Sequence, residues 1–137
     1  MSNPPNEQKS EQDWQQELSE LEYYVLRKKG TERAFSHAYD KQSAPGQYLC
    51  KACGALLFAA QHKYDSGSGW PSFYDEAQGG AVELQAQRTF FSRKTEIICG
   101  NCKSHIGHVF EDGPQPTGKR YCTNGTALNF VPQPEDE

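Results

Sequence analysis

The sequence predicts a mainly β domain with short helices at its N-terminal end, on three observations. Short β-branched or aromatic runs follow Gly30, clusters of turn residues separate them, and two CxxC pairs lie at the ends of two runs. Many short strands with frequent turns are typical of an antiparallel β architecture. The length of 137 residues fits one domain with one sizeable core.

The N-terminal segment predicts a disordered tail over residues 1–9, which are polar and contain prolines, and then two helices. Ser19 precedes Glu22 by three residues, a capping-box pattern that predicts the start of the second helix, and Gly30 is expected to close it. Apolar residues at helical spacing predict the first helix: Trp14, Leu18 and Leu21.

The rest of the chain predicts strands in GQYLC, ALLFAA, AVELQAQRTFF, TEIIC, HVFED and ALNFV. Turn residues separate these runs in SAPG, SGSG, EAQGG and DGPQPTG. We expect a single folded domain over residues 10–131, followed by a solvated acidic tail over residues 132–137.

Composition excludes several classes of function. The formal net charge of −4 argues against a nucleic-acid partner, because phosphate binding needs a basic face. No apolar run approaches the roughly 20 residues that a membrane helix needs, so no membrane partner is expected. The first residues contain no apolar segment typical of a secretory signal, so we expect a cytoplasmic protein, and by default a monomer.

Two CxxC pairs predict a metal site: Cys50 with Cys53, and Cys99 with Cys102. In a cytosolic chain, paired cysteines are metal ligands or redox groups rather than lasting disulfides. A thioredoxin-like redox motif is the alternative, but it requires a βαβ context that the strand pattern does not predict. Two knuckles together predict one Zn²⁺ ion held by four thiolates, and such a closed site is structural rather than catalytic.

The fifth cysteine, Cys122, belongs to neither pair and is a candidate nucleophile. A nucleophilic cysteine must become a thiolate, and a nearby cation lowers its pKa. Arg120 lies two positions earlier, on the same face of an extended strand, and Asp112 is a candidate carboxylate to brace it. The alternative for Arg120 is an ordinary solvated arginine.

Two further stretches contain candidate site residues. His105 and His108 lie beside the second CxxC pair, and histidine exchanges protons near neutral pH. Trp70 follows two glycines that flank a serine, and it precedes Pro71. This pattern favours an indole that is exposed on the wall of a pocket. The alternatives are structural histidines and a core tryptophan.

Four stretches together resemble the methionine-R-sulfoxide reductases of the B type: YYVLRKKGTERAFS, CKACGALLF, SGSGWPSF and CGNCKSHIGHVFEDGPQPTGKRYCTNGTALNF. The resemblance extends from about Leu18 to Phe130. It implies a β-tent of two packed antiparallel sheets with short N-terminal helices, a structural zinc ion at one edge, and a shallow pocket on the other side.

The resemblance also implies roles for individual residues. Cys122 is expected to be the nucleophile and Trp70 the wall that contacts the S-methyl group of the substrate. His105 and His108 are expected to form the polar side that contacts the sulfoxide oxygen, directly or through water, and Asn124 matches the catalytic pocket residue that follows the nucleophile. Asp112 and Arg120 match a supporting pair behind the site.

The implied activity is reduction of the R epimer of methionine sulfoxide, in oxidised proteins or peptides and more weakly as the free amino acid. Attack of Cys122 on the sulfoxide sulfur leaves a sulfenic acid. Many family members have a resolving cysteine where this chain has Ser68, so an external thiol or thioredoxin is the expected reductant. These inferences come from the resemblance and not from composition or spacing.

The alternative function is a non-catalytic, zinc-stapled β-tent that binds a ligand or protein, as in the Yippee-like group. Such a module would keep the CxxC pairs, but it has no need of Cys122, His105, His108 and Asn124 together. A zinc-ribbon nucleic-acid module is disfavoured by the acidic balance. A peroxidase-type thiol enzyme explains neither Trp70 nor the histidine pair.

Overall fold

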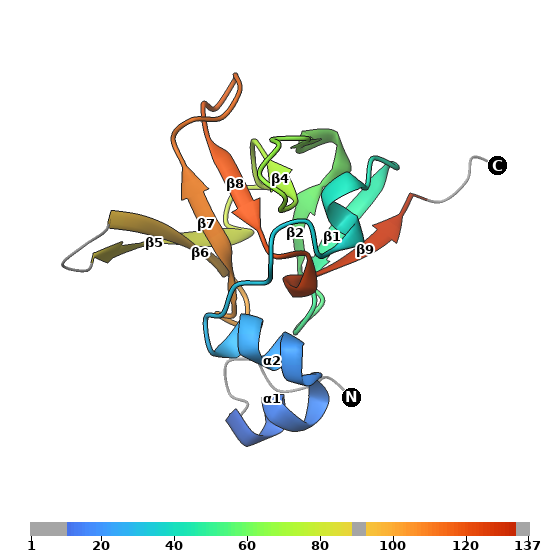
Figure 1. Cartoon of the computed structure of the whole chain (residues 1–137), viewed down its shortest axis with the longest axis vertical. Helices are drawn as coiled ribbons and strands as arrows, with labels where there is room; N and C mark the ends of the chain where they lie inside the picture. The colour runs from blue at the N-terminus through green and yellow to red at the C-terminus, as the bar shows by residue number, and fades with distance from the viewer. Residues whose placement is uncertain (1–10, 89–92, 134–137) are drawn as a thin grey trace.

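The computed structural model describes residues 11–88 and 93–133. Figure 1 shows two β-sheets that diverge from one another, with two helices beneath them. Three expectations lie wholly or partly outside the described residues: the tail over 1–9, the end of the run AVELQAQRTFF at 89–91, and the acidic tail at 134–137. Within the described part, no helix is both long and apolar enough to cross a membrane.

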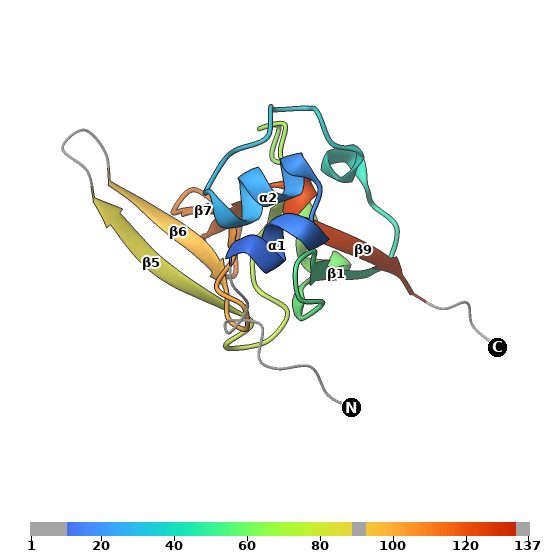
Figure 2. The same ribbon diagram turned by 90° about the horizontal axis from the view of Figure 1, so that it is seen from below.

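The helices are short. The α-helices are α1 (Glu11–Glu17) and α2 (Glu20–Arg27), and the 3₁₀ helices are η2 (Ala38–Lys41), η3 (Ala60–His62) and η4 (Gly125–Ala127). Figure 2, seen from below, shows α1 and α2 next to each other across the space between the two sheets. The main contacts of α2 with the β domain are to β7 and η4.

All strand pairs are antiparallel, which confirms the predicted fold class. One sheet has the order β2-β1-β9 and the other β3-β4-β8-β7-β6-β5. The strands are β1 (Gly46–Cys50), β2 (Leu56–Ala59), β3 (Lys63–Tyr64), β4 (Ser72–Phe73), β5 (Val82–Arg88), β6 (Arg93–Cys99), β7 (His105–Phe110), β8 (Arg120–Thr123) and β9 (Leu128–Pro132).

The core between the sheets is aromatic. Tyr48 and Phe58 come from the small sheet, and Phe73 and Tyr121 come from the large one. The rings of Phe58 and Phe73 stack with centroids 4.4 Å apart, and Tyr48 meets Phe73 edge-on at 5.1 Å. Such pairs add about 0.5–1.5 kcal/mol each beyond the burial of their apolar area. The core therefore fixes the angle between the two sheets.

The N-terminal helices confirm one expectation and correct two others. The side chain of Ser19 accepts from the amide of Glu22, and the Glu22 side chain accepts from the amide of Ser19, as the capping box predicts. Leu21 was expected on the first helix, but α1 ends before it, and Leu21 is an exposed residue of α2. The left-handed residue after α2 is Lys29, with φ of 61°, and not Gly30.

Gly30 serves packing instead. A Cβ at this position would lie 2.2 Å from the exposed ring of Tyr24, so a larger residue would displace that ring. The sequence pattern detected a glycine at the helix end, but its reason is close approach rather than a positive φ.

Candidate active site

The strand register places the candidate nucleophile beside a histidine. β8 lies between β4 and β7, and Cys122 pairs with Ser72 on one side and His108 on the other. Directly opposed residues of antiparallel strands point to the same face, so Cys122 and His108 are neighbours on one surface. The alternating residues Tyr121 and Val109 pair with each other on the opposite, core-facing side.

Gly107 makes this pairing tight. A Cβ on Gly107 would lie 2.0 Å from the carbonyl oxygen of Cys122, a distance that no side chain tolerates. The glycine between the two histidines therefore allows β7 to approach β8 at Cys122.

A β-bulge places His105 on the same face as His108. Residues three apart in a regular strand point to opposite faces. Here Ile97 pairs with Gly107 while Ile98 pairs with His105, so Ile106 is the extra residue of β7. This insertion reverses the alternation and puts both rings on one side, with centroids 5.3 Å apart.

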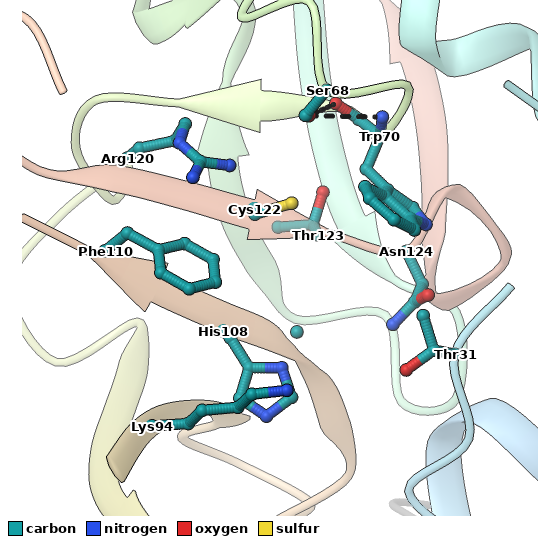
Figure 3. Close-up of a pocket in the computed structure, with 11 residues that line it drawn as sticks. Thr31, Ser68, Trp70, Lys94, His108, Phe110, Arg120, Cys122, Thr123 and Asn124 are labelled. Atoms are coloured by element: carbon teal, nitrogen blue, oxygen red, sulfur yellow. Dashed lines mark hydrogen bonds between the residues drawn. The ribbon is translucent and has the colours of Figure 1, made fainter. Parts of the chain in front are cut away.

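The pocket in front of Cys122 has a volume of about 310 Å³. Figure 3 shows Cys122 near its centre, with Ser68 and Trp70 on one side and His108 and Lys94 on the other. Its full lining is Thr31, Ser68, Trp70, Lys94, Gly107, His108, Phe110, Arg120, Cys122, Thr123 and Asn124.

The structure brings together most of the residues that the sequence predicts, at different depths. Ser68, Trp70, His108, Arg120, Cys122 and Asn124 all line the pocket. His105 is not in the lining, because it is only 2% exposed and packs against His108. Asp112 reaches the site only through Arg120. Sequence reasoning did not identify five lining residues, since none has a side chain with an evident chemical role: Thr31, Lys94, Gly107, Phe110 and Thr123.

Cys122 is half-buried, and this burial raises the pKa of its thiol. The hydroxyl of Ser68 and the guanidinium of Arg120 oppose that increase by stabilising the thiolate. Burial is the largest effect, so the resting group is a thiol and not a thiolate at neutral pH.

Arg120 is held in place beside the pocket. Its Nε donates to Oδ1 of Asp112 at 2.9 Å and its second terminal nitrogen to Oδ2 at 3.2 Å, a two-point contact that fixes the guanidinium plane. The group also lies over the ring of Phe110, 4.4 Å from its centroid. The Asp112–Arg120 pair expected from the sequence is therefore present.

A buried glutamate orients the inner histidine. Nδ1 of His105 donates to Oε2 of Glu96 at 2.6 Å, and Nζ of Lys29 lies 3.6 Å from Oε1 of the same carboxylate. Burial lowers the pKa of His105, and it also lowers the pKa of His108. Both rings are therefore neutral at pH 7. The only sequence signal for Glu96 is an acid directly before the apolar residues Ile97, Ile98 and Cys99 in the run TEIIC.

A second buried glutamate joins the other side of the pocket. The backbone of Glu32 contacts both Trp70 and Asn124: its carbonyl accepts from Trp70 Nε1 at 2.9 Å, and its amide donates to Asn124 Oδ1 at 2.9 Å. Nδ2 of Asn124 donates to the carbonyl of Ile106 at 3.1 Å, which fixes the orientation of the amide. No periodicity in the loop that contains Glu32 predicted this arrangement.

The four paired cysteines form one cluster. Their sulfur atoms all lie within 4.8 Å of one another. Cys50 and Cys102 are 3.7 Å apart and Cys53 and Cys99 are 3.6 Å apart, close to the edge of about 3.8 Å expected for a tetrahedron with metal–sulfur bonds of about 2.3 Å. The four residues therefore fit a tetrahedral metal ion.

The two knuckles have the same local geometry. In each, the residue after the second cysteine is left-handed: Gly54 with φ of 83° and Lys103 with φ of 66°. The amides of these two residues donate to the carbonyls of Cys50 and Cys99, at 2.8 and 3.0 Å. One knuckle follows β1 of the small sheet and the other follows β6 of the large sheet, so an ion would join the two sheets.

Comparison with known proteins identifies the family. A family model described as SelR domain matches residues 18–132. The chain belongs to the SelR family. A peptide methionine sulfoxide reductase MsrB of Leptospira interrogans is 51% identical over 122 residues, which are 89% of this chain and 93% of the relative.

Two further relatives of this SelR domain have the same name, peptide methionine sulfoxide reductase MsrB. The relative from Methanosarcina barkeri is 48% identical, over 93% of this chain and 90% of its own length. The relative from Acinetobacter baumannii is 46% identical, over 94% and 93%. The resemblance identified from the sequence motifs is therefore confirmed.

We expect the cysteine cluster of this SelR domain to hold one metal ion per chain. Structural zinc sites contribute about 10–16 kcal/mol of binding free energy in peptides, so Cys99→Ser should lose the ion and unfold the domain. Elemental analysis and thermal unfolding measure both effects. Cys122→Ser, which removes the one cysteine outside the cluster, is the matched control and should keep the ion. Folded protein with no bound metal would contradict the assignment.

Proposed function

We propose that this protein reduces the R epimer of methionine sulfoxide to methionine, in peptides and more weakly as the free amino acid. The single observation that carries the proposal is the pairing of Cys122 with His108 on one sheet face, in a pocket walled by Trp70. The names of the relatives support the same reaction. A binding module has no need of this pairing.

The pocket supports a substrate with one apolar and one polar substituent on sulfur. The indole of Trp70 offers an apolar surface for the S-methyl group. His108 and the second hydrogen of the Asn124 amide offer polar partners for the sulfoxide oxygen. The remaining direction leads out of the pocket, where a peptide chain can continue. Three distinct directions around a tetrahedral sulfur give a preference for one epimer.

The chemical step transfers oxygen from one sulfur to another. The Cys122 thiol reacts with the sulfoxide to give a sulfenic acid and a thioether, so the substrate sulfur gains two electrons and the cysteine sulfur loses them. The reaction requires one proton on the sulfoxide oxygen, and the thiol of Cys122 beside neutral His108 supplies it. As Cys122 attacks, His108 takes the thiol proton and delivers it to the sulfoxide oxygen. His105, oriented by Glu96, supports the ring of His108.

The metal in the cysteine cluster is proposed to be zinc. Four thiolates in a closed tetrahedron are typical of structural Zn²⁺, which needs no redox change and leaves no position for substrate. The metal would therefore stabilise the fold and take no part in the reaction. A cytoplasmic location is proposed on the same ground, because cysteines stay reduced and able to bind metal there, and a monomer is proposed by default.

The reductant is proposed to be an external thiol or thioredoxin. The metal cluster uses the other four cysteines, so none of them is free to react with Cys122. The side chain beside Cys122 is Ser68, whose hydroxyl forms no disulfide. The sulfenic acid therefore persists until an external thiol reacts with it. One thiol displaces water to form a mixed disulfide, and a second thiol releases Cys122.

The proposed function is tested with peptide substrates that contain either R- or S-methionine sulfoxide, with dithiothreitol as reductant. The wild type should reduce the R epimer and not the S epimer. Cys122→Ser should abolish the activity and leave folding and metal content unchanged, because its hydroxyl does not replace the thiolate as nucleophile. Turnover by Cys122→Ser, or no turnover by the wild type, would refute the proposal.

The pH profile follows from the two pKa shifts. Burial keeps the pKa of Cys122 above 9.0 and that of His108 below 6.5, so the pair holds one proton throughout the range between these values. Below the histidine pKa a second proton occupies the imidazole, and above the thiol pKa the required proton is lost. The single-turnover rate without reductant should be flat between pH 7 and 9, falling on either side. An alkaline decline beginning near pH 7 would contradict the proton assignment.

The sulfenic acid should accumulate when no reductant is present. One equivalent of methionine should form per chain, and a sulfenic-acid probe should then label Cys122. Ser68→Cys should convert this species into a disulfide between the new cysteine and Cys122, which mass analysis detects. Ser43→Cys, at an exposed serine outside the pocket, is the control and should not. A wild-type disulfide between Cys122 and a cluster cysteine would contradict both assignments.

A further inference from the structure

We propose that Glu32 is a positioning residue that sets the distance and angle between Trp70 and Asn124. Its catalytic consequence rests on the proposed function, but its structural consequence does not. Glu32 is only 4% exposed, although it lies in a loop next to the exposed residues Thr31 and Arg33. Each polar group of this residue has a hydrogen-bond partner near the pocket.

The carboxylate anchors the loop to the segment that follows the nucleophile. Oε2 accepts from the amide of Gly125 at 2.8 Å, and Oε1 accepts from the amide of Thr126 at 2.8 Å. Both amides are buried and begin η4, where no earlier turn of the helix supplies an acceptor. Without the carboxylate these two donors would lose their partners, which is costly in a buried position.

The backbone of the same residue transmits this anchoring to the pocket. Its carbonyl fixes the indole nitrogen of Trp70, and its amide fixes the oxygen of the Asn124 side chain. Glu32 therefore connects the aromatic wall and the amide through one peptide backbone. If the carboxylate releases the loop, both contacts change together, and the apolar and polar sides of the pocket lose their relative position.

The chain contains a matched control in Asp40. This residue is also buried, with 5% of its surface exposed, but its backbone bonds to His37 and Lys63 and not to Trp70 or Asn124. Asp40→Asn removes a buried acid from the same domain without touching the connection that Glu32 makes. Comparison of the two variants therefore separates a general loss of stability from a loss of pocket geometry.

The test uses the full chain with Trp14→Phe. Because the chain has two tryptophans, Trp70 is then the only one left. In this background Glu32→Gln replaces one carboxylate oxygen with an NH₂ group that opposes a backbone donor. We expect the emission of Trp70 to shift to longer wavelength and its quenching by acrylamide to increase. At a temperature where the variant is folded, we expect its kcat/KM for the R-sulfoxide peptide to be about 10²-fold lower, since a small misplacement of a substrate-positioning group costs about that much. Asp40→Asn should leave both unchanged.

Glu32→Asp keeps the carboxylate but shortens its reach, so it should show a smaller change in both readouts. It also decides the question if Glu32→Gln does not fold. A Glu32 variant with a lowered Tm but native Trp70 emission and native kcat/KM would overturn the proposal, because Glu32 would then only stabilise the scaffold. Absence of sulfoxide reduction by the wild type would refute the proposed function alone, since the emission of Trp70 still tests the geometry.

Discussion

The close antiparallel pairing of β7 with β8 is the constraint on which the site depends. It places His108 opposite Cys122 on one face and Val109 opposite Tyr121 on the other, so the same few residues join the pocket to the core. A shift of one residue would exchange the two faces, burying the thiol and exposing the aromatic ring. Packing of the core and alignment of Cys122 with His108 thus depend on the same strand register.

The sequence predicted the parts of the site that have a local pattern. Capping boxes and CxxC knuckles depend on neighbours within a few residues, and they occur in the structure as expected. The common face of His105 and His108 was not predictable from spacing, because it depends on a bulge that only the pairing with β6 defines. Glu32 gave no signal, since its partners lie between 38 and 94 residues away in the chain.

The electrostatics of the pocket favour the uncharged forms of Cys122 and His108. Burial opposes the charged forms of both Cys122 and His108, so a strongly ionised thiolate–imidazolium pair does not form at rest. A neutral thiol reacts slowly with stray oxidants and electrophiles. Under the proposed function, polar partners around a bound sulfoxide would offset the cost of charge separation only when substrate is present. Selectivity and protection of Cys122 would then have the same physical origin.

The cysteine cluster has a consequence for durability. Among the described residues, no strand pair joins the two sheets, so an ion bound by the knuckles is a direct link between the end of β1 and the end of β6. Cys50, Cys99 and Cys102 are buried, whereas Cys53 is only half-buried. Oxidants arriving from solvent meet Cys53 first. Oxidation of Cys53, which lies after β1 and away from the pocket, would then be the event that releases the ion and inactivates the protein.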